Sequence, residues 1–294
     1  MILFISIFAI MKKQVINILV GVVLFLLVYW DLGIIKMPEK DMRQSIQKGT
    51  VLLYRKFLLF PNHHDIVVYK SNYFQDSDSS ADKRYLFVQR VIALPGDTIK
   101  IDSGNVMVNS LFEKINAFYQ RNYIVQLKDS VEKFSYLDEN ISEKVIISKK
   151  YEYAMSLSYQ QYQELLGDTN VLSIELQLDH PSIFEESVYP YLEDIHWNKH
   201  FWGPFYLPKK NDKITLTKKN LYIYFPLIRG EEKFAEIIND SLFINKKYVN
   251  EYEFKNDYYF ALGDNRDNAI DSRFLGPIKR KDIVGIVFYQ FYKK

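Results

Sequence analysis

Acidic, basic and amide side chains alternate with small and apolar residues in the stretch GDNRDNAIDSR, from Gly263 to Arg273. Runs of charge are usually solvated faces, but the neighbouring residues on both sides are aromatic or aliphatic. Carboxylates and guanidinium groups this close together can satisfy one another as buried pairs, and such a network can support an active site. A cation-binding loop is the rival interpretation, but the spacing lacks the alternation of an EF-hand. We predict a structural network of Asp264, Asn265, Arg266, Asp267, Asp271, Ser272 and Arg273.

Histidines offer two further candidate sites for chemistry. His63 and His64 precede Asp65 before a strand-like stretch, which is typical of a polar turn rather than of a ligand pair. His196 and His200 are four positions apart, a spacing that suits a metal only on a helix. The stretch HWNKH lacks the glutamate of a zinc protease and runs into FWGP, so we predict a loop. We expect neither a metal nor a cofactor.

Composition limits the class of protein. The 294 residues are 48% hydrophobic, enough to build one large domain or two smaller ones. The net charge of +2, with both signs mixed along the chain, gives no indication of a nucleic-acid partner. The absence of cysteine excludes disulfides, thiol catalysis and cysteine-ligated metal. The 23 tyrosines and 21 phenylalanines lie mostly in alternating segments, which favours a β-rich fold.

The N-terminal region contains an uncharged stretch, VINILVGVVLFLLVYW, from Val15 to Trp30. As a helix it would span about 24 Å, slightly less than the hydrocarbon core of a bilayer. Lys12 and Lys13 precede it, so we predict a single-pass anchor with a cytoplasmic N-terminus and the body outside. A cleaved signal peptide is the rival, but only bulky residues follow the apolar run. Translation starts at Met1 or at Met11, since MKKQVINILV would be a natural beginning.

Most of the remaining chain has the pattern of short strands and tight turns. GTVLLYRKFLLF, HDIVVYK and YLFVQRVIALPGDTIKI resemble strands, with a hairpin predicted at Ser103–Asn105. SYQQYQELLG predicts a short helix with a capping box of Ser158 and Gln161 and an end at Gly167. Strands are expected around that helix and again in NDKITLT, SLFINKKYVNEYEF and DIVGIVFYQFY. The fold class predicted is mainly β with an inserted α+β region.

Three stretches in this order resemble the conserved boxes of bacterial signal peptidase I, peptidase family S26. They are the anchor followed by DMRQSIQKG (Asp41 to Gly49), QRVIALPGD (Gln89 to Asp97) and GDNRDNAIDSR. Members of that family are membrane-anchored serine endopeptidases that remove signal peptides from exported proteins. RVIALPGD departs slightly, with Ala93 where the family usually has glycine. WGPFYLPKK and FKNDYYFALGDN are similar to the long-insertion branch of the family.

The resemblance implies a division of the chain into three parts. Residues 1–35 would be the cytoplasmic N-terminus and transmembrane anchor. Residues 36–110 and 206–294 would form the signal-peptidase-like β core. Residues 111–205 would be the inserted α+β region, where the resemblance is weakest. The location implied is the bacterial plasma membrane, with most of the chain on its outer side.

The same resemblance shows substitutions at the reacting positions. Asp41 occupies the position of the family's nucleophilic serine, and Gln44 that of the proline in the same box. Gln89 occupies the position of the lysine that serves as general base. Ala269 occupies a position where the family usually has a serine that orients this lysine. We therefore find no intact catalytic pair.

The chemistry of these substitutes does not replace the pair. An amide has no useful basicity, and a carboxylate is a poor nucleophile towards a peptide bond and repels a developing oxyanion. Ser45 is the nearest alternative nucleophile, but it aligns with a threonine of the family box. If Asp41 lies in the former nucleophile pocket, we expect Arg43 or Arg90 to neutralise it, or burial to raise its pKa.

These observations leave three functions open. The first is a catalytically inactive homologue that binds a peptide, an exported protein or a membrane protein without cutting it. The second is an active signal peptidase with a non-standard nucleophile such as Ser45. The third is a structural subunit of an envelope or secretion complex that docks through the insertion.

Overall fold

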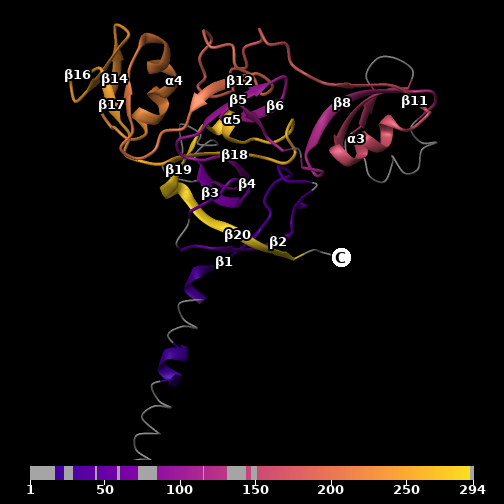
Figure 1. Ribbon diagram of the computed structural model, residues 1–294, viewed down its shortest axis with the longest axis horizontal. Helices are drawn as coiled ribbons and strands as arrows, with labels where there is room; N and C mark the ends of the chain where they lie inside the picture. Colours follow the sequence, from indigo (N-terminus) through magenta and orange to yellow (C-terminus); the bar gives the residue numbers. More distant parts are fainter. Residues whose placement is uncertain are drawn as a thin grey trace, which may run out of the picture.

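The computed structural model describes residues 17–22, 29–43, 45–57, 60–71, 85–114, 116–130, 144–146 and 151–291. Its largest element is an antiparallel sheet of seven strands, and the mainly β fold class predicted from the sequence is confirmed. In spatial order, the strands are β1 (Leu32–Lys36), β2 (Val51–Arg55), β20 (Ile283–Phe291), β3 (Ile66–Ser71), β4 (Tyr85–Ala93), β18 (Tyr258–Leu262) and β19 (Ile278–Lys279). Figure 1 shows this sheet at the centre of the body, below the other strands.

Burial along the central strands explains their position. Every residue of β18 is buried, as are Val67, Val68 and Tyr69 of β3, because both faces of the sheet are covered here. β2 instead alternates partly and fully buried residues, as expected for a strand with one covered face. The C-terminal strand β20 pairs with both β2 and β3, so the last strand of the chain lies between two of the first three.

A second sheet packs above the first and contains β12 (Trp202–Tyr206), β5 (Thr98–Asp102), β6 (Asn105–Val108) and β7 (Leu111–Phe112). The hairpin predicted at Ser103–Asn105 joins β5 and β6 and is confirmed. Its turn requires positive φ at Ser103 (51°) and Gly104 (72°), a conformation that glycine adopts without strain. Trp202 and Phe205 of β12 are fully buried in the main core beside Phe260 of β18.

The inserted region has a sheet and a core of its own. The strand order is β11 (Val171–Leu176), β8 (Gln120–Leu127), β10 (Glu152–Ser158) and β9 (Lys144–Ile146). Helix α3 (Tyr159–Leu166) follows β10, and the predicted capping box of Ser158 and Gln161 with Gly167 at its end is confirmed. In Figure 1 this sheet and helix lie to one side of the core strands. The boundaries between the three parts of the chain remain predictions. Strand β12 crosses the predicted boundary between residues 205 and 206.

A further module follows β12. The strands predicted in NDKITLT and SLFINKKYVNEYEF belong to it, whereas its helix was not expected from the sequence. Helix α4 (Lys218–Arg229) is capped by Thr217 and contains Pro226, and it packs on the sheet of β14 (Ala235–Ile238), β15 (Ser241–Ile244) and β16 (Lys247–Val249). β13 (Lys213–Thr215) pairs with β17 (Glu251–Glu253). Two short helices, α5 (Ser272–Leu275) and η2 (Arg280–Asp282), precede the C-terminal strand β20. Buried leucine, isoleucine and tyrosine side chains of α4 join the main core.

The N-terminal stretch predicted as an anchor lies partly outside the described residues. Residues 17–22 and 29–31 are helical. Within the ranges that the structure describes, no helix has the length and apolar character required to cross a bilayer. The transmembrane anchor therefore remains a prediction.

Candidate functional site

Asp41 and Gln89 are brought into direct contact by the fold. Asp41 lies in a turn after β1, and Gln89 lies in the middle of β4, where its backbone faces Val67 of β3. The Gln89 side-chain Nε2 donates to Asp41 Oδ2 at 2.8 Å. Both side chains are buried, with 7% of Asp41 and none of Gln89 exposed. A buried polar pair of this kind is stable only if its remaining donors and acceptors are also satisfied.

Gln89 meets this condition. Its Nε2 also donates to the backbone oxygen of Ile270 at 2.7 Å, so both amide hydrogens have an acceptor. Its Oε1 accepts from the Tyr69 hydroxyl at 2.6 Å. Burial raises the pKa of Tyr69 well above its ordinary value, which keeps the phenol protonated as a donor. The amide is therefore held in one orientation by three neighbours from distant parts of the chain.

The environment of Asp41 favours its neutral form. Burial raises the pKa of the Asp41 carboxyl to about 7, the Gln89 hydrogen bond opposes this rise, and the negative charge of Asp271 adds to it. Of the two outcomes expected for a buried Asp41, the structure shows the raised pKa. Arg90 instead binds another carboxylate, that of Asp264.

The backbone of the loop that begins at Gly263 packs directly against Asp41. Asn265 N donates to the Asp41 backbone oxygen at 2.8 Å. A Cβ atom at Gly263 would lie 2.3 Å from Ala269 Cβ and 2.7 Å from Asp41 O. Real atoms do not approach this closely, so the site requires glycine at position 263. Ala269 thus lies beside Asp41 and Gly263.

Ser45 points to a different group. Its Oγ donates to Asp264 Oδ2. Asp264 is fully buried and accepts two bonds from Arg90, at 2.9 Å from Nε and 2.7 Å from Nη2. The Ser45 hydroxyl is therefore part of a network with Asp264 and Arg90. Gln44, predicted from the resemblance to be a second substitution, lies outside the described residues.

The charged loop contains several buried ion pairs. Asp271 pairs with Arg273 at 2.7 Å, and its carboxylate also accepts from the backbone N–H of Gly263. Arg266 forms two bonds of 2.8 Å with Glu113 and stacks 3.8 Å above the Tyr119 ring. Asn265 forms backbone bonds with the Asp41 turn, and Ser272 Oγ accepts from Ala261 N at 3.0 Å.

Asp267 connects this loop to the inserted region. Its carboxylate accepts from Arg121 Nε at 3.1 Å, lies 3.1 Å from His200 Nε2, and accepts from Asn122 N at 2.6 Å. Although burial alone would raise the pKa of Asp267, the His200 bond and the Arg121 charge outweigh it and lower the pKa to about 2. The carboxylate is therefore ionised throughout the physiological range.

The histidine predictions have clear structural counterparts. His63 and His64 form a turn, as predicted, and His63 Nε2 lies 2.8 Å from Asp97. His196 and His200 lie in a non-helical segment, also as predicted. His200 is buried against Asp267, a role that nothing in its local sequence indicates.

Sequence reasoning also missed the partners that distant segments supply to the site. Tyr69, Glu113 and Arg121 lie in or next to strands whose local patterns give no sign of a polar role. A strand pattern predicts which side chains are buried but not which polar groups meet across the core.

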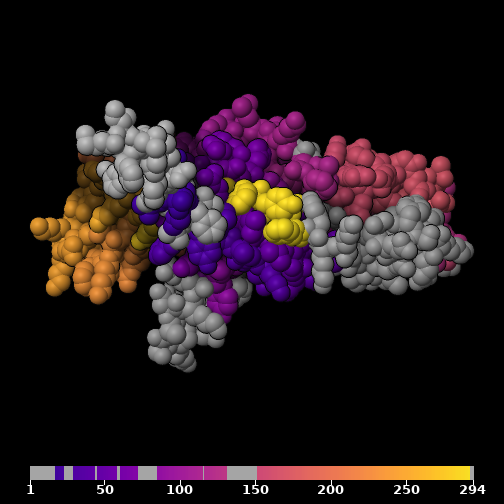
Figure 2. Space-filling model, turned by 90° about the horizontal axis from the view of Figure 1, so that it is seen from below, coloured from indigo at the N-terminus to yellow at the C-terminus, as the bar shows by residue number. Residues whose placement is uncertain are grey.

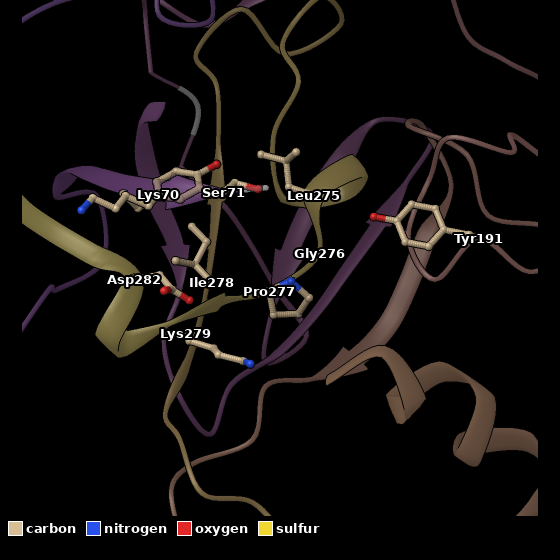
Figure 3. A pocket seen from close by; sticks show the side chains of 10 residues that line it. Lys70, Ser71, Tyr191, Leu275, Gly276, Pro277, Ile278, Lys279 and Asp282 are labelled. Carbon is tan, nitrogen blue, oxygen red and sulfur yellow. The ribbon is translucent and has the colours of Figure 1, made fainter. Parts of the chain in front are cut away.

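A pocket of about 350 Å³ opens on the other side of Tyr69. Figure 3 shows it among Lys70, Leu275, Pro277 and Lys279, with Tyr191 at its far side. Neither Asp41 nor Gln89 lines it, so it gives no access to the pair. Lys279 is tied to the Gly230 backbone oxygen at 2.6 Å, and its ammonium is therefore already committed.

The sequence of this chain was compared with families and proteins of known function. The family model "Signal peptidase, peptidase S26" matches residues 9–163 and 207–292. The signal peptidase I of Buchnera aphidicola subsp. Baizongia pistaciae (strain Bp) is 22% identical over 269 residues, 86% of this chain and 67% of that protein. The signal peptidase I of Aquifex aeolicus (strain VF5) is 54% identical over 35 residues, 12% of this chain and 14% of that protein. That of Helicobacter pylori (strain ATCC 700392 / 26695) is 33% identical over 73 residues, 25% of this chain and 20% of that protein.

The class defined by these matches is that of the signal peptidases. This chain belongs to the signal peptidase family, peptidase S26.

Proposed function

We propose that this chain is a membrane-anchored signal peptidase homologue that binds a polypeptide, an exported or membrane protein, without cleaving it. One observation carries the proposal: Asp41 and Gln89, which we predict to occupy the nucleophile and base positions of the family, are hydrogen-bonded to each other at 2.8 Å. A Ser-Lys pair works because a neutral amine takes the proton of an attacking hydroxyl. Neither a hydroxyl nor an amine stands at these two positions.

Other routes to catalysis through the same residues find little support. A carboxyl with a pKa near 7 could in principle activate water, with a neighbouring amide stabilising the oxyanion. Both amide hydrogens of Gln89 are already engaged, one by Asp41 itself and one by Ile270 O, so none points to a substrate carbonyl. Ser45 donates to Asp264, and both oxygens of that carboxylate also accept from Arg90. These contacts favour the inactive homologue over an active peptidase that uses Ser45.

Polypeptide binding by strand addition finds support in the sheet topology. β1 is one of the two edge strands of the main sheet, and on its outer side no further strand lies within the described part of the chain. An extended segment can pair with such an edge through backbone hydrogen bonds without any catalytic group.

Membrane attachment finds support in the surface near the N-terminal helical residues. Side chains of β20 are strongly exposed there, with Phe288 52%, Tyr289 54% and Phe291 48% accessible. Trp30 and Ile34 are also exposed, at 68% and 70%. Figure 2 shows β20 in yellow on this face, next to indigo residues of the N-terminal segments. Aromatic side chains prefer the interface of a bilayer. This face of the body would therefore contact the outer surface of the plasma membrane.

The test is a cleavage assay on a preprotein with an Ala-x-Ala site in detergent. The purified native chain, its Asp41→Ser/Gln89→Lys variant and its Asp41→Asn variant are compared with an active signal peptidase. We expect no cleavage by the native chain or by Asp41→Asn, and a measurable rate for the double variant. Thermal melting of each variant reports whether it is folded.

The outcomes separate the alternatives. Cleavage by the native chain that Asp41→Asn abolishes would show that Asp41 activates water, and cleavage that Ser45→Ala abolishes would assign the nucleophile to Ser45. Either result overturns the proposal. Binding is tested separately by photo-crosslinking the preprotein to the native chain, and absence of any crosslink would overturn the polypeptide-binding half.

A further inference from the structure

A cavity of about 500 Å³ lies between the core and the inserted region, and neither Asp41 nor Gln89 lines it. We call it the tyrosine cavity. Its lining residues come from β6, β7, β8, β11 and α3, from the stretches beside these elements, and from the charged loop. In Figure 1, β6 lies among the core strands, whereas β8, β11 and α3 belong to the inserted region at the side of the body. Its volume is typical of cavities that hold small organic ligands, which range over roughly 300–1,000 Å³.

Aromatic side chains are the main feature of this lining. The five are Phe112, Tyr119, Tyr123, Tyr159 and Tyr162. The rings of Tyr123 and Tyr162 stack with their centroids 4.8 Å apart and 14° between their planes, and the Tyr159 centroid lies 6.4 Å from that of Tyr162. Phe112 and Tyr159 are 71% and 39% exposed, so rings of the lining are accessible from solvent. Rings that already pack on one another lose little side-chain entropy when a ligand binds.

The ionised side chains that line the cavity are already paired with groups of opposite charge. Glu113 and Arg266 form two bonds of 2.8 Å, and Arg121 lies 3.1 Å from Asp267. Arg266 also stacks 3.8 Å from the centre of the Tyr119 ring, so this ring already has a cation on one face. A charged ligand of either sign would lose its hydration without finding an unpaired counter-ion in the lining. The charges therefore favour a neutral ligand.

The tyrosines add no charge of their own at physiological pH. Burial raises the pKa of Tyr123 to about 12, and burial also raises the pKa of Tyr119 above its ordinary value. Both phenols therefore stay protonated and neutral. The electrostatic character of the cavity is that of aromatic rings beside balanced ion pairs.

The rings also distinguish between aromatic and aliphatic ligands. Pairs of aromatic rings attract each other in stacked or edge-to-face arrangements by more than their buried area accounts for. A flat aromatic ligand would gain this attraction from several rings at once, whereas an aliphatic ligand of the same size would gain only from burial. The aliphatic lining residues, Val106, Ile174 and Leu176, favour an apolar ligand in either case. We propose that the tyrosine cavity is a binding site for a neutral, flat aromatic compound.

The experiment follows the fluorine NMR signal of a fluoroindole, a neutral bicyclic probe, at increasing concentrations in the presence of the full chain in detergent. Micelles without protein provide the reference, because detergent also takes up apolar compounds. We expect a saturable change beyond this reference, with a dissociation constant of about 1 mM or below. No saturable change beyond the micelle reference up to about 5 mM probe would overturn the proposal.

Unlabelled competitors test the chemistry of the site. Indole is the neutral aromatic compound, tryptamine and indole acetate carry the same ring with a positive or a negative charge, and cyclohexylmethanol is a neutral aliphatic ring. We expect indole to displace the probe and the other three to compete about five- to tenfold more weakly. Displacement by a charged or an aliphatic competitor at the same concentration as indole contradicts the selection for a neutral aromatic compound.

Two variants locate the binding on the molecule. Phe112→Leu and Tyr159→Leu keep an apolar side chain but remove a ring at an exposed position, so the fold should be retained, and each should weaken binding about three- to tenfold. Tyr248→Leu is the matched control, because Tyr248 is 62% exposed on β16 and does not line the cavity. Binding that neither of the first two variants weakens, or that Tyr248→Leu weakens equally, overturns the assignment. The result does not depend on the proposed function, since Asp41 and Gln89 do not line the cavity.

Discussion

Gln89 Nε2 donates to Asp41 Oδ2 at 2.8 Å across 48 positions of sequence, inside the buried part of the main sheet. Tyr69 and Ile270 complete the hydrogen bonds of the amide. These bonds engage the oxygen and both hydrogens of the Gln89 amide, so the amide has no spare donor for a substrate.

Asp41 should make stability depend on pH in an unusual direction. Its folded pKa of about 7 lies above the ordinary value of 3.8, so the folded state binds the proton more tightly than the unfolded state. The stabilising contribution is fully present below about pH 4 and is lost as the pH rises to about 7. Relative to Asp41→Asn, the native chain should lose about 2–4 kcal/mol of unfolding free energy between pH 4 and pH 8. Denaturant unfolding of both chains at several pH values measures this, and a pH-independent difference would contradict it.

Gln89 should be needed for stability because three groups depend on it. Gln89→Leu would leave Asp41 and the Tyr69 hydroxyl without their partner inside the core. We expect a loss of about 3 kcal/mol in unfolding free energy, measured by denaturant titration at pH 7. The matched control is Gln47→Leu at an exposed position, which should change stability by less than about 0.5 kcal/mol. Equal effects of the two changes would show that the buried network is dispensable.

The Asp271 carboxylate should be a main support of the charged loop. It accepts from Arg273 Nε at 2.9 Å and Nη2 at 2.7 Å, and from the backbone of Gly263 and Arg273. Asp271→Asn leaves the Arg273 charge buried without its partner, and we expect a cost of about 3–5 kcal/mol in thermal or denaturant unfolding.

A surface pair provides the control for Asp271. Asp102 lies 2.6 Å from Lys100, but both side chains are nearly half exposed. Asp102→Asn should therefore cost less than about 1 kcal/mol. A loss at Asp271 as small as that at Asp102 would mean that the loop is held by packing rather than by its ion pair.

Ser45 should contribute to structure and not to cleavage. Ser45→Ala removes one hydrogen bond to Asp264, while both bonds from Arg90 remain, so the expected cost is about 1 kcal/mol. Introduced into the Asp41→Ser/Gln89→Lys variant, it should leave the cleavage rate unchanged within about twofold. A loss of cleavage of more than tenfold in a folded variant would assign Ser45 a role in the reaction.

The sequence by itself determined the features that depend on local rules. Alternating aromatic and branched residues predicted strands, the Ser103–Asn105 turn predicted a hairpin, and Ser158 with Gln161 predicted the start of α3. Helix α4 was not predicted, since Pro226 and several tyrosines obscure its helical period and its apolar face is explained only by the core that it covers. The spacing of charges in GDNRDNAIDSR likewise predicted a network of buried charges. It did not predict the partners from other segments, such as Glu113 and Arg121.

Only the tertiary structure decided how these groups are paired. Arg90 binds Asp264 rather than Asp41, Arg266 binds Glu113, and Asp267 binds Arg121 and His200. Each of these contacts joins segments far apart in the sequence, and the choice among several neighbouring carboxylates depends on where the folded backbone holds each side chain. The same holds for Asp41: the sequence gives its residue type, but its raised pKa comes from burial, which exists only after the strands have assembled.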